Sequence, residues 1–262
     1  MRLRVLPYKL ASASAKNLAA DLRCKRLYPD ERSRFRARRQ DIIVNWGLSG
    51  GLPRGLEGAG TILNRPENVA LSSDKLRMLQ RLTERGVPTL EFTTDKGVVE
   101  GWLDEGNCVF ARTLLNSHSG RGIIELDPQA AEGQGHSAIP YAPLYTKYIK
   151  KKHEYRVHVL PNGKTEIRQK RKRNGLEEVN SRVRNHTNGY NFCKELSFRP
   201  DDLETVAIAA TKALGLDFAA LDILYNERLN KCFVIESNCA PGLENSTIRM
   251  YGDAIRERIY SR

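Results

Sequence analysis

A chain of 262 residues with 40% hydrophobic content is long enough to bury a sizeable core, which excludes disorder as an account of the whole. No apolar run reaches the roughly eighteen residues of a membrane span, and the basic first residues favour a strand over a secretory signal, so we expect a cytoplasmic protein. The formal net charge of +12 predicts an anionic partner such as a nucleotide, an acidic peptide or a nucleic acid. The five cysteines form no Cys-x-x-Cys pair, so they are expected to be reduced and structural.

The first third of the chain predicts a small parallel α/β unit. Residues 2–7 and 41–44 predict strands, and residues 12–16 open a helix between them. Ligands gather at the carboxyl ends of such strands. The helix start at 12–16 and the strand end at Asn45-Trp46-Gly47 therefore either contact a second substrate or simply form a helix cap and a strand end.

Beyond this unit, the sequence predicts a helix and then a glycine-rich loop between two short strands. A helix capped by residues 72–74 and ended by Gly86 closes the first region near residue 94. Short strands are then predicted at 108–112 and 123–126, and between them lie Ser117, His118, Ser119, Gly120, Arg121 and Gly122. The backbone N–H groups of such a loop can cover phosphate oxygens, with the arginine adding positive charge, although an ordinary hairpin turn is the alternative.

The most basic part of the chain lies between Lys147 and Arg184. Strands are predicted at 144–149, 154–160 and 164–171, and their alternation predicts a sheet face on which many of the basic side chains are exposed. On charge alone, this cationic face is either a solvated strand surface or a non-specific nucleic-acid patch.

Two acids lie in the last predicted hairpin, which residues 218–225 and 231–237 form. Asp222 is surrounded by apolar residues, and so is Glu236 on the partner strand. Carboxylates in such a setting need a cation. Together with the amide oxygen of Asn238 they predict a Mg²⁺ site, in which the ion keeps its other positions for water and nucleotide phosphates. The alternative is that neighbouring arginines neutralise both carboxylates.

The order of these motifs resembles the ATP-grasp superfamily over nearly the whole chain. The segment 234–244, Val-Ile-Glu-Ser-Asn-Cys-Ala-Pro-Gly-Leu-Glu, looks like the metal-binding signature of RimK-type glutamate ligases. The chain is also similar to phage-encoded ATP-grasp proteins, through Asn45-Trp46-Gly47, Ala111-Arg112-Thr113, Ser119-Gly120-Arg121-Gly122 and Arg184-Asn185-His186-x-Asn188-Gly189.

The resemblance implies a metal and phosphate site. Asp222, Glu236 and Asn238 match the family's metal ligands. Arg112 stands where ATP-grasp enzymes usually place a lysine on the nucleotide phosphates. Arginine also neutralises phosphate, but its planar fork is larger and differently directed, so a different contact geometry is expected.

The resemblance also implies a base-binding hinge and a group of catalytic residues. Lys147, Tyr148 and Ile149 align with the hinge whose backbone groups meet adenine. Arg168 and Arg184 fall where relatives place basic groups near the γ-phosphate and the acyl phosphate. His186 then acts either as a base for the amine or as a hydrogen-bonding scaffold, because only geometry decides between these roles.

The implied fold is α/β, with the nucleotide held between two sheet-containing lobes. We expect a pre-ATP-grasp α/β domain at 1–94, a small ATP-grasp lobe at 95–148 and a C-terminal lobe with the Mg²⁺ site at 149–262. The implied activity is ATP-dependent carboxylate–amine ligation through an acyl phosphate, with ATP and Mg²⁺ or Mn²⁺ as cofactors. Phosphoryl transfer of this kind depends on charge neutralisation and in-line positioning rather than on a protein nucleophile.

The cationic face is compatible with several carboxylate substrates, namely a free amino acid, a small polyanionic acid or an acidic peptide or protein tail, each joined to an amine. If the chain is phage-encoded, its expected compartment is the host cytoplasm. A nucleic-acid-binding module is one alternative function, but it explains the charge only and leaves the acids in the apolar hairpin unexplained. A catalytically degenerate ATP-binding protein is another, which Arg112 favours and the intact metal-ligand set opposes.

Overall fold

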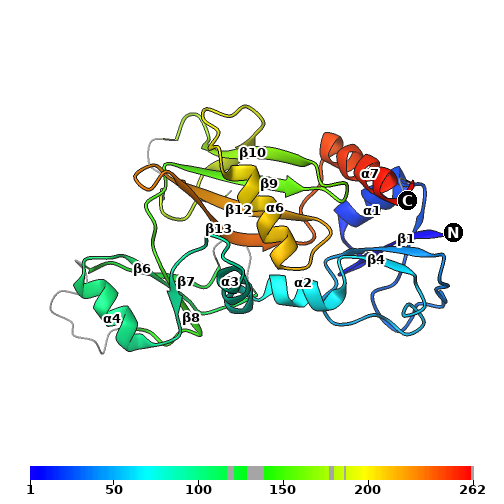
Figure 1. The fold of residues 1–262 in the computed structure, drawn as a ribbon, viewed down its shortest axis with the longest axis horizontal. Helices are drawn as coiled ribbons and strands as arrows, with labels where there is room; N and C mark the ends of the chain where they lie inside the picture. The colour runs from blue at the N-terminus through cyan, green and yellow to red at the C-terminus, as the bar shows by residue number, and fades with distance from the viewer. Residues whose placement is uncertain (117–120, 129–138, 177–179, 186, 261–262) are drawn as a thin grey trace.

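The computed structural model describes residues 1–116, 121–128, 139–176, 180–185 and 187–260. Within these residues the strands form three sheets, which Figure 1 shows in an N-terminal domain, a small lobe and a large lobe. No helix in this part of the chain combines the length and the apolar character that crossing a membrane requires.

The N-terminal sheet is fully parallel. Its strands run in the order β2-β1-β3-β4, and they are β1 (Leu3–Pro7), β2 (Lys25–Arg26), β3 (Ile42–Trp46) and β4 (Thr61–Leu63). Helix α1 (Ala13–Asp21) begins at Ser12, whose hydroxyl accepts a hydrogen bond from the Ala15 N–H at 3.3 Å. The parallel α/β unit predicted for this region is confirmed.

The last helix, α7 (Asn245–Tyr260), packs against α1 and completes the core of the N-terminal domain (Figure 1). Tyr251 on this helix is fully buried, and its ring centre lies 5.3 Å from that of Trp46. Phe218, at the entrance to the large-lobe hairpin, stacks on Trp46 at 5.4 Å. Residues far apart in the sequence therefore form one aromatic cluster.

The small lobe is an antiparallel sheet with one covering helix, α4 (Lys96–Asp104). Its strands run in the order β5-β8-β6-β7, and they are β5 (Phe92–Thr93), β6 (Val109–Arg112), β7 (Ile123–Leu126) and β8 (Leu144–Lys147). Alternation turns Val109 and Ala111 toward Val99 of the helix. Phe110 and Arg112 therefore face the opposite side, where they line a cleft.

The large lobe is a five-stranded antiparallel sheet in the order β11-β10-β9-β12-β13. Its strands are β9 (His153–Val159), β10 (Thr165–Lys172), β11 (Tyr190–Cys193), β12 (Ala219–Asn226) and β13 (Lys231–Asn238). One face is covered by the helices α2 (Pro66–Ser73), α3 (Lys75–Glu84) and α6 (Leu203–Ala213). Val157 and Leu221 point toward these helices, whereas Arg156 and Asp222 point into the cleft on the other face.

A β-bulge at Ile235 decides which way the acid of β13 points. Asp222 pairs with Glu236, but the next pair joins Ile223 to Val234, so Ile235 is the extra residue. In a regular strand Val234 and Glu236 would share a face, because side chains two positions apart do. The bulge instead sends Val234 into the core and Glu236 into the cleft.

The expectation of an exposed basic sheet face is wrong for the central hairpin. Lys151, Arg168 and Lys170 are only 7% to 17% exposed, and their side chains line the cleft. Nearby carboxylates in the cleft make this burial tolerable. The pattern of residues also left α2, α4 and α7 without a prediction, and the domain boundaries at 94 and 148 stay predictions.

Candidate active site

A cleft of about 1340 Å³ lies between the small and large lobes and reaches the N-terminal domain, which contributes Tyr8, Ser14 and Gly47. It is lined by these residues of the site predicted from the sequence: Arg112, Lys147, Tyr148, Ile149, Arg168, Arg184, Asp222, Glu236 and Asn238. The fold therefore brings three widely separated stretches of the chain to one cavity.

Part of the predicted glycine-rich loop does not line the cleft. Arg121 is exposed, and Gly122 adopts a positive φ of 72° while its carbonyl accepts hydrogen bonds from Thr113. The Thr113–Gly122 contact continues the pairing of β6 with β7 by one residue pair. Ser117, His118, Ser119, Gly120 and His186 lie outside the described residues.

The predicted metal ligands lie side by side on β12 and β13. Asp222 is directly opposite Glu236 in the ladder, and Asn238 is opposite Ala220 on the same side of the pair. The Asn238 amide nitrogen is buried and has no hydrogen-bond partner among the described residues. Two carboxylates and an amide oxygen form the hard-oxygen set that Mg²⁺ prefers, so the residues present fit this ion.

Asp222 also has protein cations as partners. Arg156 donates two hydrogen bonds to it, at 2.7 and 2.9 Å, and the Lys170 ammonium lies 3.6 Å away. Burial acts to raise the pKa of Asp222, but Arg156 and Lys170 outweigh it, so the pKa is lowered and the carboxylate is charged. The alternative, in which neighbouring arginines neutralise both carboxylates, therefore holds in part, because Arg156 pairs with Asp222.

Glu236 faces two cations that the sequence pattern did not place together. Burial lowers the pKa of Lys75, the first residue of α3, and the charge of Glu236 partly opposes that change. Burial also lowers the pKa of Arg112, at the end of β6, and the charge of Glu236 partly opposes that change as well. No sequence signal marked Lys75 as a site residue, because its burial follows from the packing of α3 against the large sheet.

A second buried carboxylate, Glu154, pairs with two lysines that line the cleft. Glu154 is 2% exposed and forms ion pairs with Lys151, at 3.0 Å, and with Lys170. Burial raises its pKa, and the two lysines together reverse the shift and lower it. The alternation of Glu154 and Arg156 along β9 is the signal that would have found this network, because both face the side that Asp222 faces.

The two arginines predicted to be catalytic have different surroundings. The Arg184 guanidinium donates to the backbone carbonyls of Lys151, Lys152 and Ser181, each at 3.2 Å, which ties its loop to the large lobe. Arg168 has an Nε that is buried without a partner among the described residues, and its one ion pair is with Glu166 at 3.3 Å. Arg168 is therefore the better placed of the two to receive an anion.

The hinge residues use some of their own backbone groups inside the small lobe. The Tyr148 N–H donates to the Cys108 carbonyl at 2.8 Å, and the Lys147 N–H donates to the Glu91 carbonyl at 2.9 Å. The Lys147 side chain lies near Glu105, at 3.5 Å, on the edge of the cleft. Tyr148 and Ile149 both line the cavity.

His158 lies at the end of the cleft nearest the N-terminal domain, where its Nδ1 is hydrogen-bonded to the Tyr251 hydroxyl at 3.0 Å. Burial, with the nearby charges of Arg156 and Arg168, lowers the pKa of His158 to about 4. The unfolded chain binds this proton near pH 6.5, so the unfolded state holds more protons between the two values.

We therefore expect the free energy of unfolding to fall by up to about 3 kcal/mol as pH drops from about 6.5 to about 4, through His158 alone. Denaturant unfolding of the wild type and of His158→Gln across that range measures the contribution. Parallel pH profiles for the two proteins would contradict it.

Comparison with solved structures decides the fold. The ATP-grasp ligase PsnB, in a complex with a minimal precursor, Mg and ADP, matches with a TM-score of 0.67 and 16% identity, over 98% of this chain and 97% of that one. The chain has the ATP-grasp fold. The D-alanine–D-alanine ligase of Bacillus anthracis also matches this ATP-grasp chain, with a TM-score of 0.64 and 14% identity over 100% of this chain and 95% of that one.

Curated relatives agree with the resemblance to RimK-type glutamate ligases. A probable alpha-L-glutamate ligase of Haemophilus influenzae (strain PittEE) is 28% identical over 196 residues, which are 72% of this chain and 63% of the relative. One from Shewanella baltica is 30% identical over 183 residues, 68% of this chain and 58% of the relative. The chain thus spans less than two thirds of the length of these relatives. No family model matches it.

Proposed function

We propose that this ATP-grasp chain is an ATP-dependent carboxylate–amine ligase. The observation that carries the proposal is the position of Glu236, which stands beside Asp222 and Asn238 on one wall of the cleft and interacts with the charges of Lys75 and Arg112. Metal-binding oxygens next to phosphate-binding cations form the surroundings that a magnesium nucleotide requires.

Each part of the cleft then has a role. The Tyr148 carbonyl and the Ile149 N–H bind the base, and Lys75 and Arg112 neutralise the phosphates. Bound Mg²⁺, or Mn²⁺ in its place, would be held by Asp222, Glu236 and Asn238 and would screen the charge of the phosphates.

Arg168 orients the carboxylate substrate and neutralises the phosphoryl group that it receives from ATP. The carboxylate oxygen attacks the γ-phosphorus and ADP leaves, which gives an acyl phosphate. The amine then attacks the acyl carbon, and phosphate leaves with the amine proton passing to solvent or to a nearby base. Because the positive charge of Arg168 is already in place, little reorganisation is needed as charge moves.

We propose a peptide or an amino acid as the carboxylate substrate. PsnB was solved with a precursor peptide and the relatives are named glutamate ligases, and the cleft of this chain extends to Lys9 and Ser14 of the N-terminal domain. The excess of cationic side chains in the cleft favours an acidic residue or an acidic peptide tail.

Incubation with Mg-ATP, single amino acids and acidic peptides tests the function. We expect ADP and phosphate in equal amounts, with a product whose mass is that of the two substrates less one water. Release of AMP and pyrophosphate would exclude the acyl-phosphate route. Binding of Mg-ADP without turnover of any substrate would favour a degenerate ATP-binding protein, and salt-dependent nucleic-acid binding that ignores ATP would favour a nucleic-acid module.

A further inference from the structure

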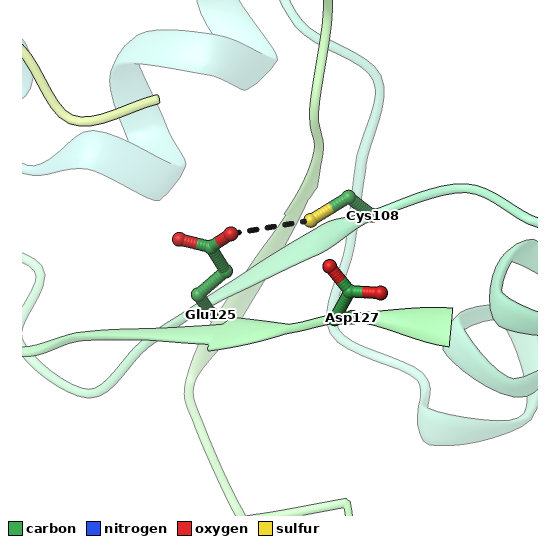
Figure 2. A group of neighbouring side chains, drawn as sticks. All are labelled: Cys108, Glu125 and Asp127. Atoms are coloured by element: carbon green, nitrogen blue, oxygen red, sulfur yellow. Dashed lines mark hydrogen bonds between the residues drawn. The ribbon is translucent and has the colours of Figure 1, made fainter. Parts of the chain in front are cut away.

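Three ligand-type side chains converge in the small lobe. Figure 2 shows Cys108, which precedes β6, together with Glu125 of β7 and Asp127 just after it, all pointing toward one another. Their ligand atoms lie within 4.8 Å of one another, a spacing that also suits a metal ion. The cation that the structure places against them is Arg182, whose Nη1 contacts Glu125, lies 2.9 Å from Asp127 and lies 3.5 Å from the Cys108 sulfur.

Arg182 belongs to the other lobe. It lies between β10 and β11, and its carbonyl accepts a hydrogen bond from the Lys151 ammonium at 2.8 Å. The Asn180 side chain accepts from the Arg182 N–H at 2.9 Å. The main chain of Arg182 is therefore held by the large lobe, while its side chain ends on two carboxylates of the small lobe.

This bridge joins the two lobes beside the hinge residue Tyr148. The Arg182 guanidinium lies 5.9 Å from the centre of the Tyr148 ring, and both residues line the cavity. The side chains of Arg182, Glu125 and Asp127 are 38%, 29% and 34% exposed, so water partly screens both ion pairs. Hydrogen bonds to both acids raise the pKa of Arg182, which keeps its charge at every accessible pH.

We infer that Arg182 is a positioning residue that fastens the small lobe to the 180–185 loop and thereby sets how firmly the cleft is closed. The same loop carries Arg184, which is hydrogen-bonded to Lys151 and Lys170 of the large lobe, so the bridge attaches the small lobe two residues away from that arginine. This inference rests on the proposed nucleotide site for its effect on nucleotide binding, but not for the bridge itself. Opening of the cleft requires the ion pairs to break, and they then re-form around bound nucleotide.

Charge reversal tests the bridge in the full-length protein. Arg182→Glu is expected to raise the dissociation constant for Mg-ADP by roughly tenfold, because three carboxylates then repel one another across the cleft. The double variant Arg182→Glu with Glu125→Arg restores an opposite-charge pair and is expected to bind within about threefold of the wild type. Arg171→Gln, on β10 and outside the cleft, serves as the matched control and should bind like the wild type.

Hydrogen exchange without nucleotide separates this inference from the proposed function. We expect faster amide exchange in residues 123–126 and 180–185 of Arg182→Glu, with recovery in the double variant, whether or not the protein binds Mg-ADP. Failure of the wild type to bind Mg-ADP would refute the nucleotide site and leave this exchange result standing. Unchanged exchange in Arg182→Glu, or loss of binding that the double variant does not rescue, would overturn the bridge.

Discussion

Replacing Glu236 with glutamine is expected to lower the rate of Mg-ATP turnover by about a thousandfold, because the metal loses a charged ligand that the phosphates depend on. Glutamine keeps the size of the side chain and one of its two oxygens but not the negative charge, so the bulge at Ile235 and the packing of β13 are preserved. Mg²⁺-dependent ADP binding, measured by calorimetry, should weaken in parallel. The variant should also require a higher Mg²⁺ concentration for half-maximal turnover.

Glu227→Gln is the matched control for this experiment. Glu227 is 61% exposed and pairs with Lys152 on the surface, far from the metal ligands in the hairpin. Turnover by that variant should equal the wild-type rate. Turnover by Glu236→Gln within tenfold of the wild type, at the same Mg²⁺ concentration, would remove Glu236 from the metal site.

Glu154→Gln is expected to destabilise the protein by about 3 to 5 kcal/mol, since breaking a buried ion pair leaves uncompensated charge. Lys151 and Lys170 are 7% and 9% exposed, and both lose the charge of Glu154 in this variant, although Lys170 keeps Asp222 at 3.6 Å. Denaturant unfolding at neutral pH gives the difference in free energy directly. The exposed pair of Lys152 and Glu227 provides the comparison, because Glu227→Gln should leave the unfolding midpoint unchanged. Equal stability of the two variants would show that Glu154 does not hold the cleft together.

Much of the fold follows from local sequence pattern. The β12–β13 hairpin was predictable because two apolar runs flank a turn, and the acids within those runs stand out against residues such as Leu221 and Val234. The first parallel unit was predictable for the same reason, since its strands are apolar and Ser12 is a good helix cap.

Three helices were harder to predict because packing, rather than pattern, stabilises them. Helix α4 contains Gly97 and Gly101, which lower its intrinsic propensity, yet Val99 is fully buried against the small sheet. Ser72 and Ser73 resemble a helix cap, but they end α2, and Asp74 alone caps α3. Where tertiary contacts outweigh local propensity, the propensity alone does not predict where a helix forms or where it begins and ends.

The sequence predicted several cations of the cleft, such as Arg112 and Arg168, but it could not predict which acid each cation meets. Lys75 and Glu236 are separated by most of the chain, and only the packing of α3 against the large sheet brings them together. The same applies to Arg182, whose carboxylate partners lie in the other lobe. Charge clusters show how many basic residues a region has, but the fold decides which of them meet an acid.

The sharing of one core by α1 and α7 has a consequence for synthesis. Val5, Leu18 and Trp46 emerge from the ribosome early, but the residues that enclose them, Tyr251 and Ile255, are made much later. A nascent N-terminal segment is therefore expected to stay protease-sensitive until translation has passed residue 255, although most domains fold as soon as their own sequence has emerged. Stalled chains of increasing length, treated briefly with protease, would show protection of the first strands appearing only after residue 255 has left the ribosome.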